Sequence, residues 1–150
     1  MKRHAAAFLL SIAALPLLGA VPPEQAPAGV NVTVTVSNMR STDGKVFACL
    51  AHDKAAYPDC RKPGGTELRM PATQAARFTF HDVTPGRYAI ALLHDENDNG
   101  KLDKALMIPK EGFGFSRDAP VTTGTPPFSA AAFDVGTQDV NLPIRMRYIL

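Results

Sequence analysis

The sequence has no tryptophan, only two cysteines and little helical periodicity. Without tryptophan and with only three tyrosines, it offers little for the exposed aromatic platform of a carbohydrate-binding module. The weak helical periodicity disfavours helix bundles and α/β folds. After the N-terminal segment, no apolar run approaches the roughly 20 residues that a membrane-spanning helix needs. The 150 residues therefore indicate one domain of the β class.

The N-terminal segment has the pattern of a secretory signal peptide. Lys2 and Arg3 precede an apolar run over residues 5–18, and Gly19 and Ala20 provide small residues for cleavage. A membrane anchor is the alternative, but a run of about 14 residues is shorter than a bilayer span. We therefore expect an exported protein, periplasmic or extracellular, with a signal peptide at 1–20, a linker at 21–29 and a single domain at 30–150.

The expected mature chain also has no excess of charge of either sign. Removal of Lys2 and Arg3 leaves 14 basic against 14 acidic residues. No basic stripe remains that would indicate nucleic acid as a partner. The expected partner is therefore an unidentified protein or envelope component, and the mature chain is expected to have no membrane span.

The two cysteines, Cys49 and Cys60, are separated by a short polar segment. An even cysteine number in an exported chain favours a disulfide, although two free thiols are the alternative. A bridge would hold the segment between them against the strand that carries Cys49.

Apolar residues alternate with polar ones in several short segments, as in half-buried strands. The clearest is "VNVTVTVS" at 30–37, and residues 87–94 are apolar on both faces, which is typical of a central strand. We predict strands at 30–37, 45–51, 77–83, 87–94, 131–135 and 139–148. The turn at 41–44 would make a hairpin of the first two, and a turn about Gly136 would make a hairpin of the last two.

These segments predict an antiparallel β-sandwich of about six or seven strands. Pro143 cannot donate a ladder hydrogen bond, so it marks an edge strand or a bulge. The region 104–130 has many glycines and prolines and is expected to be a long irregular loop, a kind of segment that is often functional.

Two motifs resemble those of a known family. "FHDVTPGRYAIALLHDENDNGKLD" spans 80–103, and "MIPKEGFGFS" spans 107–116. Together they resemble the DUF2141 family of exported bacterial proteins of unassigned function, over about residues 30–149. The resemblance implies a prealbumin-like (transthyretin-like) sandwich and no known reaction. Many members of that family have glycine where this chain has Met107.

The stretch "HDENDNGKLD" (94–103) is a candidate calcium loop. Its spacing places oxygen ligands in the first half of an EF-hand-like loop, with Gly100 at the sharp turn. The proposed ligands are Asp95, Asn97, Asn99, the carbonyl of Lys101, Asp103 and, from the next segment, Glu111. Leu106 stands where the bidentate glutamate belongs, so binding would be weak, with Kd around 10⁻⁴–10⁻³ M. The alternative is a metal-free turn in which Asn and Asp bind their own backbone.

Catalysis has less support in the sequence. No G-x-S-x-G motif is present, and the protein is expected to be non-catalytic. The alternative is a secreted hydrolase in which His94, Asp95 and Glu111 converge. A zinc site would require His52 and His94 to meet at one end of the sandwich. Without such roles, His94 is expected to hydrogen-bond within the acidic loop.

The segment "KEGFGFS" (110–116) alternates glycine with phenylalanine. Gly112 and Gly114 allow close backbone approach. Phe113 and Phe115 are candidate contacts for a ligand or partner. The alternative is that both rings close the core.

Overall fold

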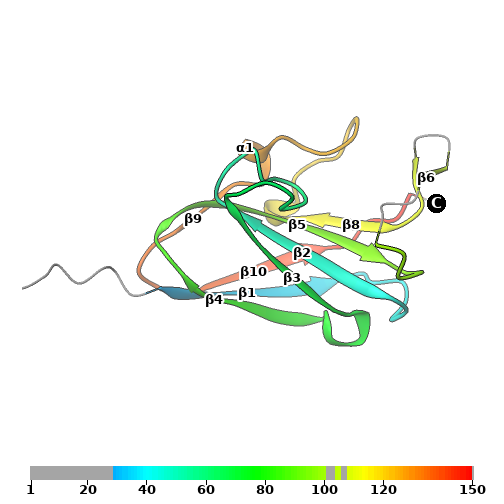
Figure 1. The fold of residues 1–150 in the computed structure, drawn as a ribbon, viewed down its shortest axis with the longest axis horizontal. Coiled ribbons are helices and arrows are strands. Elements are labelled where there is room, and N and C mark those ends of the chain that lie inside the picture. Colours follow the sequence, from blue (N-terminus) through cyan, green and yellow to red (C-terminus); the bar gives the residue numbers. More distant parts are fainter. Residues whose placement is uncertain (1–28, 101–103, 106–107, 150) are drawn as a thin grey trace, which may run out of the picture.

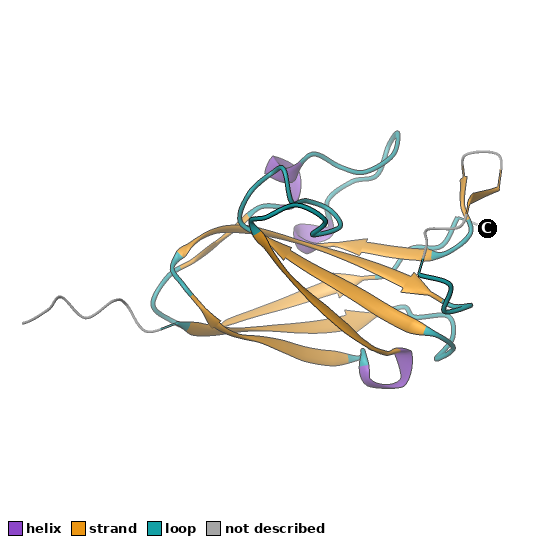
Figure 2. Cartoon of the chain, in the orientation of Figure 1, coloured by secondary structure: helices purple, strands orange, loops and turns teal. Residues whose placement is uncertain are grey.

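Two β-sheets face each other across a shared core, and most of the irregular segments lie at the ends or over one outer face (Figure 1; Figure 2). The computed structural model describes residues 29–100, 104–105 and 108–149. The predicted signal peptide and residues 21–28 of the linker lie outside these residues. The predicted β-sandwich is confirmed. Within the described residues, no helix has the length and apolar character needed to cross a membrane.

The chain forms strands, two single 3₁₀ turns and one short helix. In chain order these elements are β1 (Val30–Ser37), β2 (Lys45–Ala51), β3 (Gly65–Pro71), η1 (Ala72–Gln74), β4 (Arg77–Val83), β5 (Gly86–Asp95), β6 (Lys104–Ala105), β7 (Ile108–Pro109), β8 (Gly112–Phe115), η2 (Ser116–Asp118), α1 (Phe128–Ala131), β9 (Phe133–Val135) and β10 (Val140–Arg145).

One sheet has three strands in the order β10-β1-β4. Strands β1 and β4 are antiparallel, but β1 and β10 are parallel, with Val34 opposite Leu142. The sandwich is therefore not purely antiparallel, because β10 reaches its place from the opposite end of the sheet. Pro143 lies on this edge strand, as its missing N–H predicts.

The other sheet has the order β3-β2-β5-β8, and β9 pairs with the first residues of β5. Strand β5 is central, as its two apolar faces predict. Strand β8 pairs with β5 through Leu93 and Phe113. The prediction that the region 104–130 is irregular throughout is wrong, because this region contains the strand β8. Gly112 and Gly114 lower strand propensity, but the paired backbone of β5 supplies the hydrogen bonds that hold the segment extended.

Neither predicted hairpin forms. Strands β1 and β2 belong to different sheets, so residues 38–44 cross between the sheets instead of closing a tight turn. Met39 within this connection packs against the core, which draws the connection over the end of the sandwich. Likewise β9 pairs with β5 and β10 with β1, so the turn about Gly136 also crosses between sheets.

The alternation of apolar residues builds the core between the sheets. On β1 the four valines are buried, whereas the polar residues between them are half-buried or exposed. They pack against the inner faces of β2 and β5, including Leu50, Ile90 and Leu92. Ile144 and Met146 of the last strand and its extension are fully buried in the same cluster. Burial of this apolar surface contributes about 25 cal/mol per Å² to the free energy of folding.

Two glycines let β8 approach the opposite sheet. A Cβ on Gly112 would lie 2.3 Å from the Tyr148 ring, and one on Gly114 would lie 2.8 Å from Cγ2 of Ile144. Phe113 N donates to Arg147 O (3.0 Å), and Arg147 N donates to Phe113 O (2.8 Å). The two sheets are therefore joined by backbone hydrogen bonds along this side.

This close approach makes a stability prediction. Gly114→Ala should lower the free energy of unfolding by about 1–3 kcal/mol, because the methyl group overpacks Ile144 and the neighbouring backbone. Gly136→Ala is the matched control, since nothing lies within 4 Å of a Cβ there. Urea unfolding of both variants measures the difference. Equal stability of the two would contradict the close packing of β8.

Candidate functional site

His94 lies near the end of β5, on the face that points to the core, and is fully buried. We call this end of the sandwich, where the end of β5, the 38–44 connection and the C-terminal segment meet, the polar end. Its Nε2 lies 2.9 Å from Asp43 O, and its Nδ1 lies 2.8 Å from the Tyr148 hydroxyl. A carbonyl oxygen can only accept, so Nε2 carries a hydrogen, and in the neutral ring Nδ1 accepts from the tyrosine. The expectation that His94 bonds within the acidic loop is wrong. Its partners come from the 38–44 connection and from the C-terminal segment.

Asp95 begins the acidic loop with a buried carboxylate. Asn99 N donates to its Oδ1 (3.1 Å), and Gly100 N donates to its Oδ2 (2.7 Å). Asn99 N also lies 3.2 Å from Asn97 Oδ1. Gly100 has φ +72°, the left-handed conformation that the sharp turn needs. The charge of Asp95 is thus met by backbone N–H groups of its own loop.

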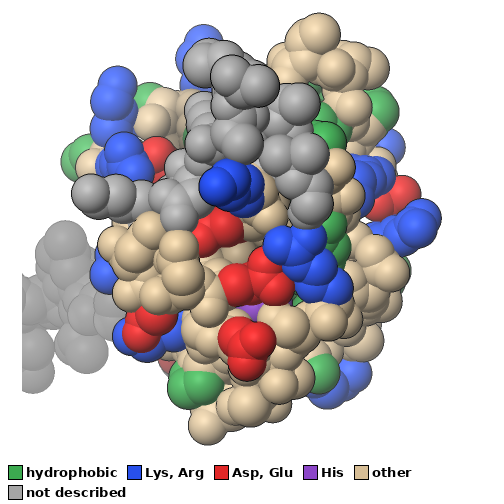
Figure 3. Space-filling model, turned by 90° about the vertical axis from the view of Figure 1, so that its right-hand side faces the viewer, with side chains coloured by type: hydrophobic (Ala, Val, Ile, Leu, Met, Phe, Trp, Pro, Cys, Tyr) green, Lys and Arg blue, Asp and Glu red, His purple; other side chains and the backbone are tan. Residues whose placement is uncertain are grey.

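A charged network closes the same end. The Arg40 guanidinium forms a two-pronged ion pair with Glu96, donates to Lys110 O (2.9 Å) and lies 4.5 Å from the centroid of the Tyr148 ring. The hydrogen bonds from Arg40 lower the pKa of Glu96, and partial burial opposes that shift. Burial raises the pKa of Tyr148. Figure 3 looks onto this end, where acidic and basic side chains lie next to each other around the centre.

The structure brings together only part of the predicted calcium ligands. Asp95, Asn97 and Asn99 share the loop, whereas Lys101 and Asp103 lie outside the described residues. Glu111 is buried and directly precedes Gly112, which pairs with His94. Among the described residues, no group of three or more His, Cys, Asp or Glu side chains could hold a metal ion.

The two histidines of the possible zinc site, His52 and His94, do not meet. His52 follows the end of β2 at which Ala51 pairs with Ala89, whereas His94 pairs with Val46 at the other end of that strand. The two histidines therefore lie at opposite ends of the sheet, because β2 and β5 run antiparallel. Ser116, the serine after "GFGF", is fully buried, with its hydroxyl bonded to the backbone of Ile90 and Ala131.

The outer face of the larger sheet is apolar. Alternate residues of β2, β5 and β8 point outward there, among them Phe47, Leu93, Phe113 and Phe115. The outer face of the three-stranded sheet is polar by contrast, with Thr33, Thr79 and Asn141 in register across it. An apolar outer face needs a cover or a ligand, since isolated sheets face water with polar residues.

Two segments cover part of this apolar face. Residues 116–131 place Ala119, Phe128 and Ala131 over Ala89, Ala91 and Phe115. The loop after β2 covers the neighbouring area. Cys49 and Cys60 lie at disulfide distance, 2.03 Å between the sulfur atoms, so the bridge ties this loop to the outer face of β2.

A groove of about 600 Å³ lies on the part of the face that residues 29–100, 104–105 and 108–149 leave uncovered. Its walls include Phe47, Leu93, Phe113 and Phe115, and its rim carries the ion pairs Asp59–Arg61 and Glu67–Arg69. The Arg69 guanidinium lies 5.1 Å from the centroid of the Phe47 ring. Phe113 and Phe115 are 8% and 6% exposed, so they form the floor of the groove and not a protruding lip.

Sequence reasoning did not identify Phe47, Leu93 or Arg69 as groove residues. The signal was the apolar character of both faces of residues 87–94, which indicates something packed on each side. It could not show that the cover on the outer side is incomplete.

The chain matches the family model of DUF2141, an uncharacterised protein family conserved in bacteria, over residues 34–142. The protein belongs to this family. No curated protein and no solved structure matches the chain. The DUF2141 match runs from within β1 to within β10, so it includes the groove and the acidic loop, while Tyr148 of the polar end lies beyond it.

The polar end yields a prediction about the acidic loop. Asp95→Asn should destabilise the protein by about 1–3 kcal/mol, because one buried carboxylate oxygen that accepts a backbone N–H is lost. Asp98→Asn is the matched control, since that exposed carboxylate makes a surface ion pair with Lys45, which is worth about 1 kcal/mol or less. Thermal melts report both changes.

The same melts separate a metal-free turn from a calcium site. The backbone donors to Asp95 predict identical melting temperatures in EDTA and in millimolar calcium. A calcium-dependent rise that disappears in Asp95→Asn would contradict this prediction and support the metal site.

Proposed function

We propose that the protein is an exported, non-catalytic binding protein that holds a ring-bearing apolar ligand in the outer-face groove. The observation that carries the proposal is the uncovered apolar floor on the outer face of the larger sheet. Ligand pockets typically have about 300–1,000 Å³ and mostly apolar walls with a few polar groups. The groove has this size and composition.

The aromatic walls favour a ligand with rings. Phe47, Phe113 and Phe115 offer faces and edges against which another ring can pack in offset or edge-on geometry. The rim charges occur as opposite pairs, so the rim favours no strong net charge on the ligand. This supports the expected contact role of Phe113 and Phe115, with the two rings acting as the floor of the site.

The disulfide supports the export part of the proposal. Disulfides persist in oxidising compartments and are rare in the reducing cytosol. The Cys49–Cys60 bridge also fixes one wall of the groove, because Pro58 and Asp59 line it. A wall held in this way loses little conformational entropy when a ligand binds.

Two observations favour a non-catalytic role over the hydrolase alternative. The ring nitrogens of His94 are both engaged and the side chain is fully buried. Asp95 and Glu111 are also buried, at 0% and 3% exposure. A general base needs to reach the proton that it abstracts. We propose the acidic loop as architecture that anchors the end of β5, with calcium not required.

The proposal is tested with N-phenylnaphthylamine, an uncharged ring probe that fluoresces in apolar surroundings. Leu93→Glu should weaken its binding by about tenfold or more, since a carboxylate then stands on the apolar floor and must be desolvated. Leu93 is half-buried at the groove surface, so the variant keeps the inner core intact.

Asn141→Glu is the control, because it adds the same charge on the polar outer face of the other sheet, where Asn141 is exposed. Wild type and Asn141→Glu should bind alike. A wild-type protein that leaves the probe dark, or a Leu93→Glu variant that binds it with unchanged affinity, would refute the proposal.

A further inference from the structure

The sandwich is closed along one side and open along the other. On the closed side, backbone hydrogen bonds join Phe113 to Arg147. On the opposite side the edge strands are β3 and β4. The turn η1 connects them at one end, and among the described residues no backbone hydrogen bond joins one strand to the other. Figure 1 shows the two strands diverging from the η1 corner.

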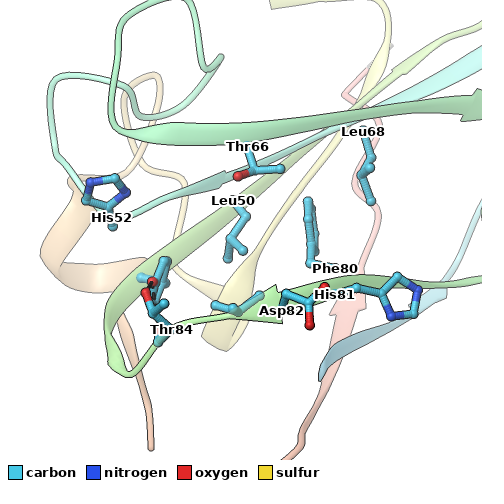
Figure 4. A pocket seen from close by; sticks show the side chains of 10 residues that line it. Leu50, His52, Thr66, Leu68, Phe80, His81, Asp82 and Thr84 are labelled. Atoms are coloured by element: carbon cyan, nitrogen blue, oxygen red, sulfur yellow. Dashed lines mark hydrogen bonds between the residues drawn. The ribbon is translucent and has the colours of Figure 1, made fainter. Parts of the chain in front are cut away.

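A cavity of about 400 Å³ occupies the open end of this wedge. Leu50, Thr66 and Leu68 project from the larger sheet toward β4, and Phe80 projects back from β4 (Figure 4). Thr66 is exposed although it sits on the inner face of β3, opposite Leu50 in register with β2. Leu68 and Met70 farther along this face pack against the core, so the inner face of β3 is exposed at its Thr66 end.

The backbone of β4 is unusual at the rim of this cavity. Asp82 has φ +55°, a conformation that residues other than glycine rarely adopt, and the β1–β4 register shifts between Val30 and Val32. Gly29 packs directly on it, since a Cβ there would lie 2.4 Å from the Asp82 carbonyl carbon. Conformations of this kind cost about 1–3 kcal/mol and cluster at ligand sites.

The polar groups around the mouth are mostly uncharged hydrogen-bonding groups. The Tyr88 hydroxyl donates to Thr84 O (2.9 Å) and lies 3.2 Å from the Thr84 hydroxyl. The His52 ring packs edge-on to the Tyr88 ring. The lining contains an acidic side chain, Asp82, and no lysine or arginine. This chemistry disfavours an anionic head group.

We propose that this inter-sheet cavity is a second binding site, for an aliphatic chain with an uncharged hydroxyl or carbonyl head. The chain enters between β3 and β4 and packs against Leu50, Leu68, Phe80 and Val83, where it removes apolar surface from water. The head remains at the mouth near Thr66 and Thr84. The site is separate from the outer-face groove, because Thr66 and Glu67 point to opposite faces of β3.

Because Thr66 and Glu67 face opposite sides of β3, substitutions at these two positions distinguish the inter-sheet cavity from the outer-face groove. Octanol binding is measured by calorimetry for wild type, Thr66→Val, Thr66→Trp and Glu67→Trp. Thr66→Trp fills the mouth and should weaken binding about tenfold or more, whereas Thr66→Val keeps the shape, removes only the hydroxyl and should weaken binding much less. Glu67→Trp places the same ring on the outer face and should leave octanol binding unchanged.

Octanoate should bind wild type at least about tenfold more weakly than octanol, because the Asp82 carboxylate lines the cavity and no lysine or arginine does. If Thr66→Trp does not fold, Leu68→Phe takes its place, since it narrows the same cavity with an apolar ring. Undiminished octanol binding in the mouth-filling variant, loss of binding in Glu67→Trp instead, or no binding by wild type would overturn the proposal.

Discussion

The central strand β5 is apolar on both faces, and the rest of the structure follows from this constraint. Its inner face, with Ile90 and Leu92, packs into the core between the sheets. Its outer face, with Ala89 and Ala91, packs under residues 116–131. A strand that is apolar on both sides must be covered on both sides, because exposed apolar surface costs about 25 cal/mol per Å². Those covering segments place the functional surfaces.

The two halves of the outer face of β5 differ in the size of their side chains. Toward its start, alanines let the covering segment pack closely, and Ala131 and Ala119 are almost completely buried. Toward its end, Leu93 and its neighbour Phe47 are larger and only partly buried. The disulfide-tethered loop and the 116–131 segment stop short of them. The groove is therefore the part of the apolar face that the described residues leave uncovered.

Local alternation predicted most of the strands. The four valines of β1 and the two apolar faces of β5 identified their elements and their burial. Strand β3 was missed, because Glu67 and Arg69 point outward and the preceding Pro-Gly-Gly reads as a loop. Both hairpins were wrong for a shared reason. A turn signal shows where the chain reverses, but the sheet that the next strand joins depends on contacts far along the sequence.

The candidate site was predictable to a similar degree. The disulfide and the positive φ of Gly100 follow from local sequence. The partners of His94 do not, since Tyr148 lies 54 residues away in the chain. The glycines of "KEGFGFS" indicated close backbone approach, but only the fold shows that Tyr148 and Ile144 are what they approach. The position of the groove depends on where the 116–131 segment and the loop after β2 end over the outer face, and no short sequence motif predicts this.

The most direct test of this account is leucine-methyl NMR of the protein during titration with N-phenylnaphthylamine. Leu93 is on the groove surface, whereas Leu142 packs against the core on the other sheet. We predict a saturable shift of the Leu93 methyl signals with little change at Leu142. Unchanged Leu93 signals at saturating probe would show that the outer face of β5 is not a binding surface.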